Sequence, residues 1–83
     1  MTSYLVTGGS GYFGALVVAQ LHAAGHRVRV LDLNDADDRP SDVEFVQGDV
    51  RDRAVVRVAV GGVDVVVSKV ALVALAEGRG LRR

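Results

Sequence analysis

Short apolar runs recur along the chain, and segments rich in glycine or charge separate them. The first run, residues 3–7, stops at glycine, which is typical of a strand buried on both faces. The second run, 26–32, alternates valine with arginine and closes on Asp32, so it predicts a strand with one wetter face. Two later apolar runs, 43–49 and 63–68, predict two further strands.

Helical spacing follows the first apolar run. Apolar side chains recur every three or four residues across 12–24, and Gly25 stands where a helix-ending glycine belongs. These side chains are Phe13, Leu16, Val17, Leu21 and Ala24. Residues 52–60 predict a second helix, which starts near Asp52 and ends at two glycines. The segment 70–77 is also compatible with a helix, whereas 34–42 holds charge and the only proline and predicts a solvated connection.

Strands that alternate with helices define an α/β fold. Such a chain forms a parallel sheet with right-handed crossovers, and helices flank the sheet. We expect the strands, numbered along the chain, to lie in the order 3-2-1-4. Because parallel strands end at the same edge, the residues that follow each strand should gather there.

The composition is that of one small globular domain. Of 83 residues, 49% are hydrophobic and 24% are charged, with ten Lys and Arg balanced by ten Asp and Glu. This balance gives no reason to expect nucleic acid or an acidic membrane as a partner. Without cysteine there is no disulfide or thiolate site, and we expect no bound metal. No apolar run reaches the roughly 18 to 20 residues of a membrane span, and no signal-peptide pattern opens the chain, so we expect a cytoplasmic protein.

Four glycines lie in the stretch VTGGSGYFG, where the first predicted strand ends and the first predicted helix begins. A strand, a tight glycine turn and a helix N-terminus together form a diphosphate site, because free N–H groups and the positive end of the helix dipole face the anion. A side chain at Gly8 or Gly11 would hold the phosphates away, and one at Gly14 would push the helix off the strand. Two registers fit the same letters: Gly8, Gly11 and Gly14 with Thr7 in front, or Gly9, Gly11 and Gly14.

An acidic residue at the end of the following strand completes this pattern. Asp32 lies 18 residues after Gly14 and closes the second predicted strand, where a ribose diol would be held. Its carboxylate would repel the 2′-phosphate of NADP, so the sequence predicts NAD as the cofactor, with NADP disfavoured. The nearest basic residue after Asp32 is Arg39, seven positions on, which argues against a phosphate clamp.

Asp49 follows the third predicted strand at the same edge of the sheet, where the adenine end of a dinucleotide would lie. The same residue is suited to cap a helix that begins near Arg51. We therefore expect Asp49 to contact the cofactor, to cap the helix, or to do both.

These residues resemble the extended short-chain dehydrogenase/reductase family, which includes NAD-dependent epimerases and dehydratases and 3β-hydroxysteroid-dehydrogenase-like enzymes. The stretches VTGGSGYFG, RVRVLDLN, VEFVQGDVRD and GVDVVVSKVALV follow the order and spacing of the first half of that family. The resemblance implies that residues 1–83 form an incomplete NAD(P)-binding Rossmann domain without the substrate-binding and catalytic half. It implies that Asp32 holds the adenosine ribose and that Asp49 and Val50 flank the adenine. It also implies that the residues around the pyrophosphate are Thr7, Gly8, Gly11, Tyr12, Phe13 and Gly14.

The chain departs from this family in the residues that carry out chemistry. The family uses a tyrosine with a lysine four residues later, but Tyr4, Tyr12 and the single lysine, Lys69, do not form such a pair. Ser68 stands where a histidine is common after the fourth strand. The two histidines of this chain lie on and just after the first predicted helix, which favours a surface role. We expect no catalytic residue within these 83 residues.

Several functions remain open from the sequence. The leading interpretation is a dinucleotide-binding segment that does not catalyse by itself. The alternatives are a piece of a larger active oxidoreductase or epimerase, a non-catalytic sensor of NAD(H), and a methyltransferase-like fold with another adenosine ligand. The fourth strand would lie at the edge of the sheet with its valines exposed, so we expect self-association there, over residues 63–75.

Overall fold

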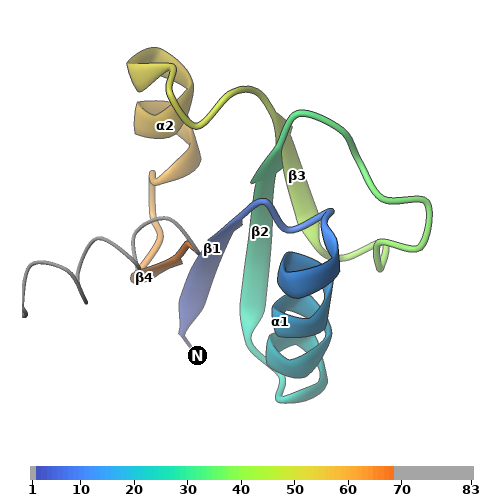
Figure 1. Ribbon diagram of the computed structural model, residues 1–83. Coiled ribbons are helices and arrows are strands. Elements are labelled where there is room, and N and C mark those ends of the chain that lie inside the picture. The colour runs from blue at the N-terminus through green and yellow to red at the C-terminus, as the bar shows by residue number, and fades with distance from the viewer. Residues whose placement is uncertain (1, 69–83) are drawn as a thin grey trace, which may run out of the picture.

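A computed structural model of the chain describes residues 2–68 and places a four-stranded parallel sheet between two helices (Figure 1). The strand order is β3-β2-β1-β4, as predicted. Three adjacent strand pairs, all parallel, hold the sheet together. The elements are β1 (Ser3–Thr7), α1 (Tyr12–Ala23), β2 (Arg27–Asp32), β3 (Glu44–Gln47), α2 (Arg53–Ala59) and β4 (Val65–Val67).

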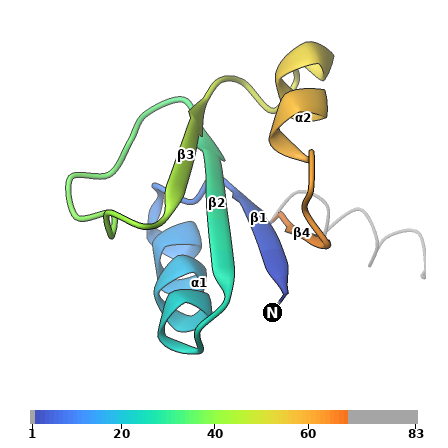
Figure 2. The same ribbon diagram turned by 180° about the vertical axis from the view of Figure 1, so that it is seen from behind.

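The two helices cover opposite faces of the sheet, as the two views show (Figures 1 and 2). On the α1 face, the core consists of valines from the strands together with helix residues; its members include Val6, Val28, Val30, Val17, Val18 and Leu21. On the α2 face, Leu5 and Leu31 pack against Ala59. Side chains alternate between faces along a strand, so neighbouring Leu5 and Val6 belong to different cores.

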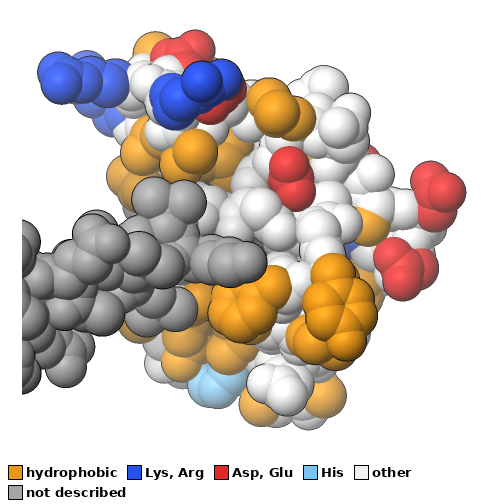
Figure 3. Space-filling view, in the orientation of Figure 1, with side chains coloured by type: hydrophobic (Ala, Val, Ile, Leu, Met, Phe, Trp, Pro, Cys, Tyr) orange, Lys and Arg blue, Asp and Glu red, His pale blue; other side chains and the backbone are white. Residues whose placement is uncertain are grey.

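The buried face of α1 differs from the predicted one. Gly14 and Val18 are buried, and Val17 and Leu21 pack against the core. In contrast, Phe13 is 43% exposed and Leu16 is 50% exposed. This helix is apolar almost all round, so three- and four-residue spacing does not single out one face. Hydrophobic side chains consequently gather on the surface over α1 (Figure 3).

Local signals at the helix ends match the structure. Gly25 follows α1 with a φ of 85°, a left-handed conformation that suits glycine after a helix. The carboxylate of Asp52 accepts hydrogen bonds from the backbone N–H groups of Ala54 at 3.0 Å and Val55 at 3.4 Å, and so caps α2. The segment 70–77, for which a helix is predicted, lies outside the described residues.

The arginine face of β2 is only partly exposed to solvent. Arg27 is exposed, but Arg29 reaches under the end of α2 and donates to the carbonyl oxygens of Ala59 at 2.7 Å and Gly61 at 2.9 Å. A cation at a helix C-terminus satisfies carbonyl groups that have no partner within the helix. Arg29 therefore ties the second helix to the centre of the sheet.

The connection between β2 and β3 carries no helix or strand and is held by side chains. Arg39 donates to both carboxylate oxygens of Asp35, at 2.7 and 2.9 Å, and its guanidinium lies 5.5 Å from the centre of the Phe45 ring. Asp42 makes a 2.8 Å contact with His22 near the end of α1. Acidic side chains are prominent on the surface where this connection lies (Figure 3).

Candidate functional site

A glycine turn joins β1 to α1 at the edge of the sheet where the parallel strands end. Gly8 has a φ of 69°, a region that glycine enters without strain, and its N–H donates to the carbonyl of Leu31 at the end of β2. The N–H of Gly11 donates back to the carbonyl of Gly8 at 3.1 Å and closes the turn. The turn is thus fixed to the sheet before the helix begins.

The glycines of the turn fall into two groups by their surroundings. Gly9 and Gly14 are buried, and a Cβ would lie 2.7 Å from Val30 at the first and 2.1 Å from the carbonyl oxygen of Gly8 at the second. Gly8 and Gly11 are exposed; a Cβ on Gly8 would meet no atom within 4 Å, and one on Gly11 only that carbonyl oxygen, at 3.5 Å. Packing within the described residues therefore requires Gly9 and Gly14, but leaves the space above Gly11 open.

This arrangement refines the roles given to the glycines from the sequence. We expected a side chain at Gly14 to push the helix off the strand, and the nearest obstacle is in fact the backbone of the turn itself. Gly9 belongs to the alternative glycine register, and its lack of a side chain is explained by its contact with Val30. The two registers differ only in Gly8 and Gly9; Gly8 is exposed and Gly9 is buried, which favours the register with Gly8, Gly11 and Gly14.

Within residues 2–68, no side chain caps the N-terminus of α1. Gly11 is the N-cap residue and provides no side-chain hydrogen bond, and the first turn contains no acidic residue. The N–H groups at the start of a helix lack partners within the helix and carry partial positive charge. The second helix differs, because the side chain of Asp52 caps its N-terminus. The first turn of α1, which Tyr12 and Phe13 open, is suited to an anion.

Asp32 is fixed beside this turn by two backbone groups. Its Oδ2 atom accepts a hydrogen bond from the N–H of Ser10 at 3.0 Å, and its Oδ1 atom accepts one from the N–H of Leu33 at 2.7 Å. The carbonyl of Asp32 also accepts from the N–H of Gly48 at 2.9 Å, which joins the end of β3 to the site. One carboxylate thus links the glycine turn to the end of β2.

Asp49 does not cap α2, so that part of the prediction is wrong. The cap is Asp52, whose N–H donates to the carbonyl of Asp49 at 2.9 Å, so the turn places the helix start beyond Asp49. The Asp49 carboxylate instead accepts from the N–H and the guanidinium of Arg51, at 2.7 to 3.1 Å. Hydrogen bonding to Arg51 lowers the pKa of Asp49 to about 2. The neighbouring Val50 is 51% exposed.

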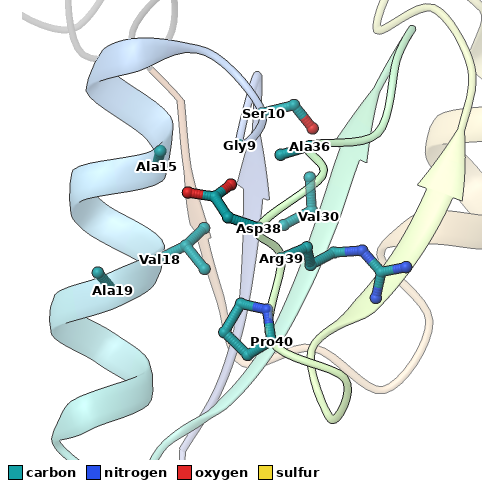
Figure 4. Close-up of a pocket in the computed structure, with 10 residues that line it drawn as sticks. All are labelled: Gly9, Ser10, Ala15, Val18, Ala19, Val30, Ala36, Asp38, Arg39 and Pro40. Atoms are coloured by element: carbon teal, nitrogen blue, oxygen red, sulfur yellow. The ribbon is translucent and has the colours of Figure 1, made fainter.

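A hollow of about 120 Å³ lies between α1 and the connection that follows β2 (Figure 4). Its floor is apolar and includes Val18 and Val30, and its rim includes Ser10, Asp38 and Pro40. The hydroxyl oxygen of Ser10 is buried and has no hydrogen-bond partner within the part of the chain that the structure describes. The hollow therefore begins at the residue that holds Asp32.

The histidines lie at the other end of α1 from the glycine turn. His22 contacts Asp42, and the ring of His26 meets that of Tyr4 edge to face with centroids 5.1 Å apart. Among residues 2–68, no group of three or more acidic or histidine side chains is placed to hold a metal ion. No helix within the same residues is long and apolar enough to cross a membrane.

Ser10 is the residue that the sequence did not single out. Its contribution to the site is a backbone N–H, which every residue except proline possesses, so its identity carries no signal. The position of Ser10 between two glycines of the turn is the only feature of the sequence that could have indicated it.

Comparison with known proteins places the chain in a family. The sequence pattern of the NAD dependent epimerase/dehydratase family matches residues 4–78. An uncharacterised protein of Sinorhizobium fredii is 48% identical over 77 residues, which are 93% of this chain and 19% of that protein. A 3β-hydroxysteroid dehydrogenase/Δ5→4-isomerase of Mycobacterium tuberculosis is 38% identical in an alignment that covers 89% of this chain and 20% of the enzyme.

A solved structure of a related protein has a similar fold. A short-chain dehydrogenase/reductase superfamily protein from Agrobacterium tumefaciens, determined with bound NAD, superimposes with a TM-score of 0.71 at 35% identity, over 80% of this chain and 19% of that protein. The chain belongs to the NAD dependent epimerase/dehydratase family. It is a Rossmann-type segment that spans about a fifth of the length of the curated relatives named above.

Proposed function

We propose that this chain binds NAD at the edge of the sheet where β1, β2 and β3 end. The observation that carries the proposal is the uncapped N-terminus of α1, which opens from a glycine turn beside a fixed carboxylate. A diphosphate would supply the acceptors that the first N–H groups of α1 lack. The open space above Gly11 supports close approach of such a group to the backbone.

The proposed contacts divide along the dinucleotide. The diphosphate lies at the glycine turn and the helix start, which Thr7, Gly8, Gly11, Tyr12, Phe13 and Gly14 form. Asp32 accepts from the ribose diol with lone pairs that its two backbone donors leave free, since each carboxylate oxygen accepts more than one hydrogen bond. Arg51 holds the carboxylate of Asp49, so the adenine meets the exposed side chain of Val50 and the main chain beside it.

NAD is the preferred cofactor in this proposal, and NADP is disfavoured. The negative charge of Asp32 accepts from a ribose diol but repels a phosphate on the same sugar. A bound nicotinamide dinucleotide supplies hydride transfer in enzymes that use it. The proposed contribution of this chain is limited to holding and orienting that group, since its sequence contains no tyrosine–lysine pair for proton transfer.

Calorimetric titration of the full chain with NAD tests the proposal. We expect saturable binding with one site per chain, and we expect Gly11→Val to abolish it because a branched side chain fills the space above the turn. Far-ultraviolet circular dichroism of the variant should show unchanged helix content. Absence of heat from the unmodified, folded chain would refute the proposal.

A second proposal is that the chain is one piece of an active oxidoreductase or epimerase. It is supported by coverage, since the chain spans only 19–20% of the curated relatives named above. Finding a Tyr-x-x-x-Lys pair in coding sequence downstream of Arg83 would establish this, whereas a stop codon followed by unrelated sequence would favour a binding segment or NAD(H) sensor. We propose a cytoplasmic location in either case, in line with the cysteine-free composition.

We also propose that two copies of the chain associate through β4. This strand lies at the end of the sheet order and pairs only with β1 within residues 2–68. Val65 is 40% exposed and Val66 is 49% exposed. An edge strand with apolar side chains and unpaired backbone groups favours pairing with an identical edge.

A further inference from the structure

The hollow beside the glycine turn adjoins the proposed ribose contact through one residue. The N–H of Ser10 donates to Asp32, while the side chain of Ser10 lines the hollow (Figure 4). Any group attached to the ribose on the Ser10 side of Asp32 would therefore meet the rim of this hollow. The charges on that rim bear directly on which dinucleotide fits.

The connection after β2 presents a free carboxylate to the hollow. Figure 4 shows the Asp38 carboxylate directed toward α1, across the hollow. Within residues 2–68, the Asp38 side chain makes no hydrogen bond or ion pair, and the residue is exposed. Its charge is not neutralised by any neighbouring side chain of this part of the chain.

The cation next to Asp38 is turned away from the hollow. Arg39 also lines the hollow with part of its side chain, but Figure 4 shows its guanidinium pointing away from α1. Asp35 holds that guanidinium through two hydrogen bonds, the ring of Phe45 lies beside it, and the carbonyl of Val43 accepts a further hydrogen bond. An arginine that is paired with a carboxylate through two hydrogen bonds is held in place and its charge is balanced, so it attracts a further anion less strongly.

We propose that Asp38 is a second specificity-determining residue, which excludes a 2′-phosphate from the hollow while Asp35 keeps Arg39 from attracting one. The inference rests on the proposed binding of NAD, and it adds Asp38 to Asp32 as a residue that selects NAD over NADP. A 2′-phosphate carries about two negative charges at neutral pH, so an unpaired carboxylate across a small hollow repels it. The adenosine diol of NAD carries no such charge and is unaffected.

The test compares three asparagine variants of the full chain by calorimetry with NAD and with NADP. We expect Asp38→Asn to raise the affinity for NADP relative to NAD by about fivefold, and the gain to shrink in 0.5 M salt. Asp37→Asn is the matched control, since Asp37 is equally charged, exposed and adjacent but does not line the hollow. Asp37→Asn should change the ratio of NADP affinity to NAD affinity less than twofold. Asp35→Asn should raise the ratio by about threefold through release of Arg39, and adding Arg39→Gln should remove that gain.

The outcomes separate this inference from the proposed function. Binding of NAD with an unchanged ratio in Asp38→Asn overturns the inference alone, and so does an equal change in Asp37→Asn, which would reflect net charge only. An Asp35→Asn gain that survives Arg39→Gln overturns the part assigned to Arg39. Failure of the unmodified chain to bind NAD at all overturns both the inference and the proposed function.

Discussion

The backbone N–H of Ser10 donates to Oδ2 of Asp32 at 3.0 Å and links the glycine turn to the end of β2. The other oxygen of the same carboxylate accepts from the N–H of Leu33 at 2.7 Å. Both donors are backbone groups, so the carboxylate is positioned before any ligand arrives. Preorganisation of this kind lowers the entropic cost of ordering the site when a ligand binds.

Asp32→Asn is expected to weaken NAD binding by about tenfold and NADP binding by less. The two N–H groups reach different oxygens of Asp32, and an amide replaces one of these oxygens with an NH2 donor, so the bond from Ser10 or from Leu33 is lost. The neutral amide also no longer repels a phosphate. Parallel titrations with the two dinucleotides measure the change. Equal losses for NAD and NADP would show that Asp32 supports the turn but does not select the cofactor.

Gly11→Ala and Gly14→Ala should separate binding from folding. A Cβ on Gly11 meets its nearest protein atom at an ordinary 3.5 Å, so we expect the fold to persist while NAD affinity falls at least tenfold. A Cβ on Gly14 would lie 2.1 Å from the carbonyl oxygen of Gly8, so we expect that variant to lose about 2 kcal/mol of unfolding free energy or more. Urea unfolding and calorimetry on the same samples give both quantities. The assignment fails if Gly11→Ala unfolds the chain or Gly14→Ala leaves it unchanged.

Charge at the end of the sheet should keep the chain monomeric. Val65→Lys places a cation on β4, and lysine on an edge strand discourages pairing between identical edges. We expect sedimentation at tens of micromolar to show a dimer for the unmodified chain and a monomer for the variant. Val58→Lys is the control, since Val58 is 70% exposed and belongs to α2 and not to the edge strand. A well-folded monomer of the unmodified chain would contradict self-association.

The ion pair between Asp49 and Arg51 should stabilise the fold in a pH-dependent way. Because the pKa of Asp49 in the folded chain is about 2, below its ordinary value, its contribution is present above about pH 4 and is lost as the pH falls toward 2. We expect Asp49→Asn to lower the midpoint of thermal unfolding at pH 6 and the difference to vanish near pH 2. A difference of equal size at both values would mean that Arg51 does not stabilise the charged form.

The strands and their order could be predicted from the sequence because each strand carries a continuous or alternating apolar run between clear breaks. The start of α2 near Asp52 was also predicted, although the cap itself was assigned to Asp49. The buried face of α1 was not, because apolar residues surround that helix. The choice between Asp49 and Asp52 as the helix cap depended on the turn between them, in which the N–H of Asp52 bonds to the carbonyl of Asp49.

At the candidate site, the glycine spacing and the distance to Asp32 could be read from the sequence, since both are spacings along the chain. The separate roles of Gly9 and Gly14 could not, because they depend on Val30 and on the carbonyl of Gly8, which only the folded turn brings close. The contact between Ser10 and Asp32 also arises from folding, since a backbone donor leaves no mark on residue type.

Amide chemical shifts of the isotopically labelled chain, recorded by NMR while NAD is added, test the central claim most directly. If the diphosphate binds the uncapped start of α1, the largest shifts will occur at the N–H groups of Gly11, Tyr12 and Phe13, with a second set at Ser10 and Leu33 beside Asp32. The capped start of α2, at Ala54 and Val55, should not respond. Shifts that are absent at the glycine turn, or that are largest at α2, would contradict the account.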